Sequence, residues 1–292
     1  MRFCFIFLIS FLFIPVGESN DTIFADTTYW TINVSTGLNF NQVSFSKNWK
    51  SGGNNSVSIS GLFNGKTDYN KGKIDWVNNA DLQYGKINNE GQGIRKSVDK
   101  IQLDSKFGYA INKKWNAFSS LSFLSQFDDG FVYFENDSSG KISGFMAPAF
   151  ITSSWGVEYK PNEVFNIRIS PFSPRITLVN DTALYHYIPE NYGVQTGKTV
   201  RYEWKAFKLS ASYENKIVEN INIKSKYELF ASLDDFKLKN TDHRLDLLIT
   251  AKIYKFLNLT LNSNYLYDID QDKNIQSSIL IGLSFLLDYK NQ

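Results

Sequence analysis

Charged side chains recur at alternate positions along several segments of this 292-residue chain. Lys224, Lys226 and Glu228 lie two residues apart, as do Asp104 and Lys106. Residues two apart in a β-strand point to the same face, so charges of both signs would gather on one face of a sheet. Each charge must then be hydrated or paired with an opposite charge. The candidates that we assign to this face are Asp81, Asp104, Lys106, Glu158, Arg168, Lys224, Lys226, Glu228, Asp246 and Lys252.

Histidine, which nucleophilic catalysis would most need, is scarce in this sequence. The chain has 2 histidines, His186 and His243. A serine hydrolase requires a histidine within hydrogen-bond reach of the serine that it activates. Neither histidine lies in a recognisable nucleophile motif, so we interpret both as ordinary loop or rim residues and expect no enzymatic activity.

Acidic residues and cysteine give no metal-site pattern either. Asp268, Asp270 and Asp272 offer alternate carboxylates, but the glycine turn and the distal glutamate of a calcium loop are missing. Cys4 is the only cysteine and lies in the N-terminal segment 1–19, so the mature chain has no cysteine for a disulfide or a zinc site. A net charge of +2 gives no general signal for binding a polyanion. We therefore expect no metal, no cofactor and no nucleic-acid partner.

Apolar side chains alternate with the polar ones. Between 256 and 267, Leu257, Leu259 and Leu261 fall on one face, and asparagine and threonine fall on the other. A helix would mix the two classes. After the N-terminal run, no apolar stretch approaches the roughly 18 residues that a spanning helix needs. A membrane crossing would therefore have to use strands.

Segments of this kind predict an all-β fold, an antiparallel transmembrane β-barrel of about 12 strands. The spans that we expect are 30–46, 55–65, 74–87, 97–110, 115–128, 148–160, 163–179, 201–215, 219–234, 242–254, 256–268 and 275–289. Pro171 and Pro174 fall inside one of these spans, so we expect that strand to be kinked or to extend above the membrane.

The connections between these spans alternate between short and long. Outer-membrane barrels place short turns in the periplasm and longer loops outside the cell. The tight connections are at 112–113, 161–162, 217–218 and 255, with a less regular one at 66–73. The longer ones are 129–147, 180–200, 235–241 and 269–274.

A soluble β-sandwich or lipocalin-like barrel would show the same alternation, with its apolar face turned inward. The strand lengths, the asymmetry of the loops and the aromatic residues near strand ends, such as Trp30, Trp115, Trp155 and Tyr159, favour the membrane barrel.

The N-terminus has the organisation of a secretory signal. Arg2 supplies a positive start, the residues from Phe3 to Val16 are almost wholly apolar, and 17–19 form a small-x-small cleavage site. We therefore expect export to the outer membrane. The division that we expect is a signal peptide (1–19), a short N-terminal segment (20–29), a transmembrane barrel (30–289) and a C-terminal extension (290–292).

Several motifs along the mature chain carry a family resemblance. The first runs from Leu38 to Ser46 and continues through Asn48-Trp49 and 51–56; the others are at 81–85, 95–100, 147–150 and 159–162. They resemble an uncharacterised family of Gram-negative outer-membrane β-barrel proteins, a family of unknown function. The resemblance implies the fold and the location, and it carries no activity and no catalytic residues.

Two functions remain open at this point. In the first, the barrel is a narrow porin-like channel or a selective transporter for small solutes, and the mixed charges form its constriction. In the second, it is a non-conducting barrel that acts as a binding or scaffold protein through its external loops, and the same charges cross-link its wall. The partners that we expect are outer-membrane lipid, the barrel-assembly machinery during biogenesis and, for the first function, small solutes.

Overall fold

The computed structural model describes residues 29–44, 46, 54–134, 138–186, 190–234 and 240–290. The predicted signal peptide lies outside the described residues. Within them, no helix is long and apolar enough to cross a membrane.

Twelve antiparallel strands form a closed wall, as the alternation predicted. They are β1 (Trp30–Val43), β2 (Ser56–Lys71), β3 (Ile74–Asn89), β4 (Gly93–Ala110), β5 (Trp115–Ser125), β8 (Ala149–Tyr159), β9 (Phe165–Phe172), β14 (Ala206–Val218), β15 (Ile221–Ser232), β16 (Asp242–Tyr254), β17 (Leu257–Asp268) and β18 (Asp272–Lys290). Each pairs with its neighbour, and β1 pairs with β18 to close the ring. β8 pairs with both β5 and β9.

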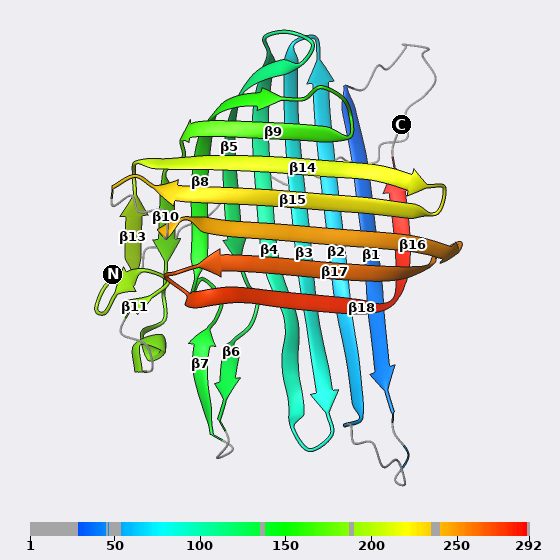
Figure 1. Cartoon of the computed structure of the whole chain (residues 1–292), viewed down its shortest axis with the longest axis vertical. Helices are drawn as coiled ribbons and strands as arrows, with labels where there is room; N and C mark the ends of the chain where they lie inside the picture. The colour runs from blue at the N-terminus through cyan, green and yellow to red at the C-terminus, as the bar shows by residue number, and fades with distance from the viewer. Residues whose placement is uncertain are drawn as a thin grey trace, which may run out of the picture.

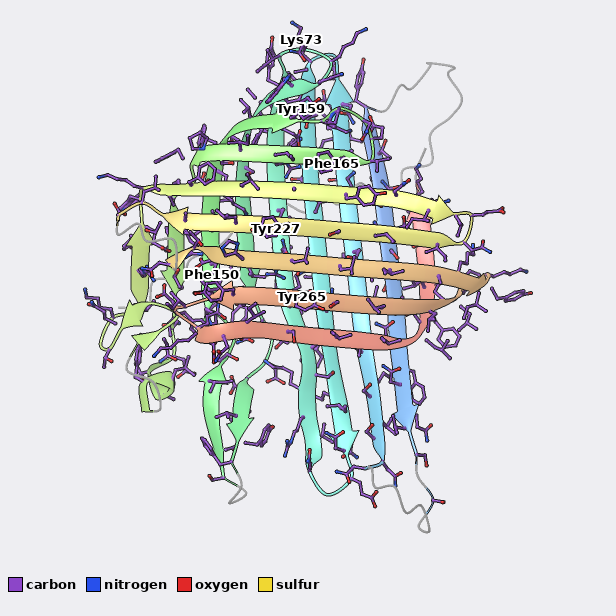
Figure 2. The ribbon with its side chains drawn as sticks, viewed as in Figure 1. Lys73, Phe150, Tyr159, Phe165, Tyr227 and Tyr265 are labelled. Carbon is purple, nitrogen blue, oxygen red and sulfur yellow. The ribbon has the colours of Figure 1, made fainter. Side chains whose placement is uncertain are left out.

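The ring is flattened into two walls. In Figure 1, β1 to β5 run lengthwise at the back, and β14 to β18 cross them steeply at the front. Figure 2 places Tyr227 and Tyr265 on the front wall and Lys73 at the tip of the β2–β3 turn. Because the walls face each other, side chains from one can approach side chains from the other.

The longer connections lie together at the end of the barrel that we take as external. One, between β5 and β8, holds the hairpin β6 (Gly130–Tyr133) and β7 (Ser139–Ser143). Another, between β9 and β14, holds β10 (Arg175–Leu178), the 3₁₀ helix η1 (Thr182–His186), β11 (Glu190–Asn191), β12 (Val194–Gln195) and β13 (Val200–Glu203).

The expected spans 163–179 and 201–215 are each broken in the structure. β9 gives way to β10 at Ser173-Pro174, and β13 gives way to β14 at residues 204–205. Pro174 has no N–H to donate to a ladder. The chain bends there, while the Ser173 N–H bonds to the Ala206 carbonyl at 2.8 Å and the Pro174 carbonyl accepts from Ser153 N–H at 3.0 Å. The expected kink is confirmed.

The short turns owe their geometry to asparagine. Asn112 Oδ1 accepts the N–H groups of Lys114 and Trp115 at 2.9 and 3.0 Å. Asn162 Oδ1 does the same for Val164 and Phe165 at 3.0 and 2.9 Å. An asparagine that caps the next backbone donors fixes a tight turn.

Three predicted connections need correction. Most of 66–73 is strand, because β2 runs to Lys71 and pairs up to the turn. Residues 217–218 belong to β14, whose pairing with β15 continues past an irregularity to Val218. The connection expected at 269–274 has only the three residues between Asp268 and Asp272.

The distribution of buried and exposed side chains distinguishes a membrane barrel from a soluble one. On β18, Ile281, Leu283 and Phe285 are 54%, 44% and 58% exposed, whereas Ser284 between them is fully buried. Serine, threonine and asparagine on other strands are likewise buried inside. A water-soluble barrel would show the opposite arrangement. The exposed apolar outer wall therefore belongs in lipid.

Aromatic side chains border this wall near the short turns. Trp115 and Tyr159 lie opposite each other on β5 and β8 with ring centroids 4.8 Å apart. Trp30 lies 5.9 Å from Trp76. Such aromatic pairs at strand ends mark the level of a membrane interface.

Gly156 in β8 occupies a close backbone approach. The β8–β9 register shifts between Trp155 and Val157. A Cβ on Gly156 would overlap the Ile169 carbonyl and lie 2.8 Å from Ser170 Cα. Glycine within a strand commonly marks such a place.

We predict that Gly156→Ala lowers the free energy of unfolding by about 1–3 kcal/mol, because backbone atoms cannot move aside as a side chain can. Urea titration of the refolded barrel, followed by its shift in gel mobility, measures the change. Gly61→Ala is the matched control, since its Cβ would meet only the Leu38 Cδ2 at 4.0 Å. Equal losses in the two variants would contradict this account.

Candidate functional site: a charged constriction between two walls

The strand registers place the predicted charged residues on the inner face of the ring. Lys106 is paired with Ser120, which is in turn paired with the buried Ser154, and Asp104 and Glu158 lie at alternate positions on the same face. Contacts then divide the predicted set. Asp81, Asp104, Lys106, Glu158, Arg168, Lys226, Glu228 and Asp246 all join inner ion pairs.

One group of charges lies along a single stretch of wall. Lys106 Nζ is 2.7 Å from Glu158 Oε2 and 2.9 Å from Asp75 Oδ2. Arg168 Nε donates to Glu158 Oε1 at 2.7 Å. Glu158 is 2% exposed, so its charge is held by two cations rather than by water.

A second group crosses the barrel. Lys226 Nζ on β15 lies 4.0 Å from Asp104 Oδ2 on β4. Lys100 Nζ on β4 lies 3.9 Å from Asp246 Oδ2 on β16. β4 and β16 are diametrically opposite in the ring, because β5, β8, β9, β14 and β15 separate them on one side and β3, β2, β1, β18 and β17 on the other. These contacts define a constriction between the two walls.

Each member of the constriction also has a closer partner on its own wall. Lys100 Nζ is 2.6 Å from Asp81 Oδ2. Arg244 Nε donates to both Asp246 oxygens at 3.1 Å. Lys226 lies 3.2 Å from Glu228 Oε1. The same-wall contacts are thus shorter than the contacts that cross.

Lys224 and Lys252 lie apart from the constriction. Lys224 pairs with Glu214 at 2.8 Å, and both side chains are more than half exposed. Lys252 is an exposed residue near the β16–β17 turn, and its N–H bonds to the Asn220 carbonyl. The spacing placed both on the correct strands without revealing their height in the barrel.

Sequence reasoning missed several members. Lys100, Lys208 and Arg244 follow the same alternation as the predicted residues, so the signal was present. Lys208 lies 2.8 Å from Glu228 Oε1. Arg175 and Glu203 had no such signal, because both belong to the short strands created by the break at Pro174.

Arg175 connects the β9–β14 connection to the far wall. Its Nε donates to Glu203 at 2.7 Å and its Nη1 donates to Asp242 of β16 at 2.6 Å. The guanidinium also lies 3.7 Å from the centroid of the Phe230 ring. Arg201 similarly pairs with Asp270 in the β17–β18 turn. β10 and β13 are therefore fastened across the external end of the barrel.

The two large connections also pack on each other. Ala147, Val179, Leu184 and Val194 form a small buried cluster. Tyr192 donates from its hydroxyl to the Ile142 carbonyl at 3.0 Å. Burial raises the pKa of Tyr192 to about 12. The neutral phenol is therefore the form that this contact uses near neutral pH.

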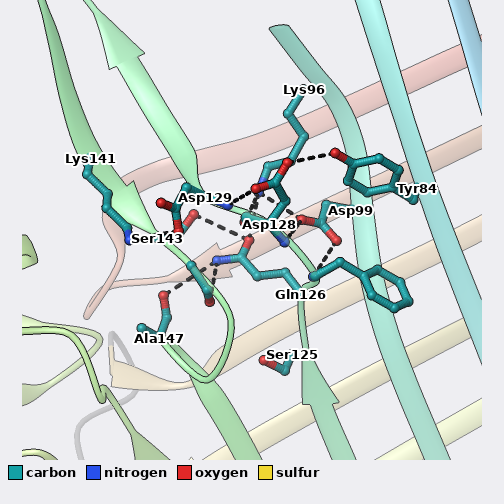
Figure 3. Close-up of polar contacts among 12 residues, drawn as sticks. Tyr84, Lys96, Asp99, Ser125, Gln126, Asp128, Asp129, Lys141, Ser143 and Ala147 are labelled. Atoms are coloured by element: carbon teal, nitrogen blue, oxygen red, sulfur yellow. Dashed lines mark hydrogen bonds and ion pairs between the residues drawn. The ribbon is translucent and has the colours of Figure 1, made fainter.

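A polar cluster at the external rim fixes the start of the β5–β8 connection (Figure 3). Asp99 accepts the N–H groups of Phe127 and Asp128 at 2.7 and 3.0 Å, and Lys96 holds Asp99 at 2.9 Å. Its carboxylate thus satisfies backbone donors of a chain that has left the sheet. A hydrogen bond from Tyr84 is the main reason that the pKa of Asp128 lies below its ordinary value.

Lys141 joins the two connections. Its ammonium lies 2.7 Å from Asp129 and 2.6 Å from Asp181. Hydrogen bonds to Asp129 and then Asp181 raise the pKa of Lys141. The bond from Lys141 lowers the pKa of Asp181.

His243 lies on the opposite face of β16 from Arg244, at the external rim. Its Nδ1 is 2.7 Å from the Tyr227 hydroxyl and its Nε2 is 2.8 Å from Thr241 Oγ1. The side chain of His186 lies outside the described parts of the chain. Among the described residues, no three histidine, cysteine or acidic side chains are arranged to hold a metal ion.

Residues 40–131 match the family described as "Protein of unknown function (DUF3078)". Over these residues the resemblance to an uncharacterised family is confirmed, and the motifs at 147–150 and 159–162 lie outside the match. No curated protein matches the chain.

Three solved structures illustrate what the chain is similar to. An outer membrane channel from Pseudomonas putida F1 has a TM-score of 0.42 at 8% identity, over 89% of this chain and 95% of that one. The translocator domain of the autotransporter NalP from Neisseria meningitidis has a TM-score of 0.38 at 8% identity, over 88% and 87%. The NanC porin has a TM-score of 0.39 at 8% identity, over 86% and 98%. At this level of similarity, nothing about the function of this chain follows from theirs.

We predict that Glu158→Gln lowers the free energy of unfolding by about 3 kcal/mol, because Arg168 loses the carboxylate that compensates it and Lys106 keeps only Asp75. Urea unfolding of the refolded barrel measures the loss. Glu214→Gln is the control, since its pair with Lys224 is exposed and a surface pair contributes at most about 1 kcal/mol. A control as destabilised as Glu158→Gln would sink the prediction.

We also predict that the packing of the two connections survives mild acid. The pKa of Asp181 is below its ordinary value of 3.8. Its contribution to stability is therefore complete above pH 3.8 and is lost as the pH falls further, through the lowered pKa. The protection factors of the backbone amides in residues 138–186, from which the intrinsic pH dependence of exchange is removed, should stay constant down to pH 5 and fall only below pH 3.8. Asp181→Asn should lower these protection factors already at pH 5, and a wild type whose protection does not change in acid would contradict this view.

Proposed function

We propose that this protein is a narrow outer-membrane channel for small polar solutes, with the Lys226–Asp104 and Lys100–Asp246 contacts as its constriction. The observation that carries the proposal is the difference in contact length. The two ion pairs that cross at the constriction measure 3.9 and 4.0 Å, too long for hydrogen bonds. The pairs within one wall include 2.6 and 2.8 Å contacts.

This difference means that the walls are not locked together by these charges. Rotation of the Lys226 side chain would break its contact with Asp104 while its 3.2 Å contact with Glu228 remains. No backbone movement is required for such a rotation. Side chains that part and rejoin in this way fit a narrow path that solutes cross one at a time.

Solvent access supports the same proposal. The side chains of Lys226 and Asp104 are 28% and 27% exposed, although they lie well inside the ring. Lys100 and Asp246 keep 13% and 21%. Water can therefore reach the charges, as a conducting path requires.

A specific contact favours the second candidate, a non-conducting barrel that acts through its external loops. Asn262 Nδ2 on β17 donates to Gln83 Oε1 on β3 at 3.2 Å, a true hydrogen bond between the walls. The fastening of β10 to β16 over the external end supports the same candidate. Conductance separates the two candidates.

The test is single-channel conductance of the refolded protein, with Lys226→Gln as the variant. Glu228 keeps Lys208 and Asp104 keeps Gln102 in this variant, so no carboxylate is left alone. Two unit charges about 4 Å apart in water interact by about 1 kcal/mol, so the loss of the Lys226 charge favours a passing cation and disfavours a passing anion by that much each. The cation-to-anion permeability ratio should therefore change by about 2 kcal/mol, a rise of roughly thirtyfold.

Lys224→Gln is the matched control. It removes the same charge from the same face of the same strand, two residues toward the short turn, where the side chain is 51% exposed. Its permeability ratio should stay near that of the wild type. An inserted barrel that never conducts, or equal shifts in the two variants, would overturn the channel and favour the loop-acting barrel.

A further inference from the structure

A cavity of about 370 Å³ lies between the constriction and the external connections. Gln83, Lys100 and Arg244 belong to its floor, and Pro148, Tyr192 and Gln271 come from the connections above. Its size falls within the range of about 300–1,000 Å³ that small-molecule sites occupy. Any solute on the proposed path would occupy this space immediately before the constriction.

The charged groups around the cavity already form ion pairs or hydrogen bonds with other groups of the protein. Lys100 is held by Asp81 at 2.6 Å, and Arg244 by Asp246 at 3.1 Å. Asp99 accepts two backbone N–H groups and Lys96. A charged solute would have to displace one of these contacts, and truncating a buried charge pair is costly.

The remaining polar groups are neutral. Asn264 and Ser278 lie opposite each other on β17 and β18 and both line the cavity, together with Ser97. The Asn264 amide donates to Asn262, which leaves its oxygen to accept. Hydroxyl and amide groups of this kind pair with the hydroxyls of a neutral ligand.

Two aromatic rings complete the wall. Phe150 and Tyr192 lie edge to face with centroids 6.4 Å apart. The hydrogen bond from Tyr192 to Ile142 fixes its ring. Rigid aromatic surface beside amides and hydroxyls suits a molecule with both C–H faces and hydroxyl groups.

We infer that this cavity is a binding site for small neutral polyhydroxylated solutes, the size of a mono- or disaccharide. The inference rests on the proposed channel for its role in passage, since such a solute would be held directly above the constriction. Binding itself needs no conduction and can be measured separately.

The test is binding of glucose and maltose to the refolded protein in detergent micelles, by calorimetry or saturation-transfer NMR, with glucosamine and gluconate as charged probes. The neutral sugars should bind more tightly than either charged one. Ser278→Phe, which places a ring in the cavity, should abolish binding. Asn264→Ala should weaken it about tenfold, the effect of one lost hydrogen bond to a desolvated group.

Ser277→Phe is the matched control. Ser277 is opposite Tyr265 on the lipid-facing side, where an added phenyl ring is tolerated, so binding should be unchanged. No binding of neutral sugars, equal or tighter binding of charged ones, or indifference to Ser278→Phe would each overturn the inference. A conducting barrel without sugar binding would refute the site and keep the channel. A silent barrel that binds sugar would refute the channel and keep the site.

Discussion

Closing twelve strands into a flattened ring sends every second side chain into a space that two opposing walls share. Lipid covers the other face, so the polar side chains of each strand must lie inside the ring. The inner charges must then find partners among themselves, and Glu158 between Lys106 and Arg168 shows how completely they can do so. Burial in this molecule is consequently reversed from that of a soluble protein, with serine, threonine and charged groups inside and isoleucine, leucine and phenylalanine outside. The wall, the constriction and the cavity above it all follow from this requirement.

Much of the fold could be predicted from the sequence because the side-chain period of a strand is two and the outer face is apolar. Leu257, Leu259 and Leu261 against Asn258 and Thr260 identify β17 without further information. Pro174 likewise predicted a break in its strand. What the sequence could not reveal was how the break is used, because the short strands β10 and β13 depend on pairing with distant partners.

The candidate site was predictable in a narrower sense. Alternation identified which charges share the inner face, and the same rule applied to Lys100 and Arg244 would have added them. It could not say which charges meet. The side chains of Asp104 and Lys226 meet only because β4 and β15 face each other across the ring. Lys224 is two residues from Lys226, yet its side chain lies at the exposed end of the strand. The height of a side chain along the barrel axis and the strand that it faces both depend on the closed ring, and no local sequence pattern encodes them.

The break at Pro174 has a structural meaning beyond the bend itself. The Ser173 N–H is already bonded to the Ala206 carbonyl, so the chain leaves and re-enters the wall at two points that are side by side. Between these points β10 pairs with β8 and β13 pairs with β10, which extends the wall, and the 3₁₀ helix, β11 and β12 form an insertion beyond this extension. Such an insertion can vary in length and composition without disturbing the register of any membrane-spanning strand. The membrane-spanning strands can therefore keep their pairing while the segment that covers the external end changes in sequence and length.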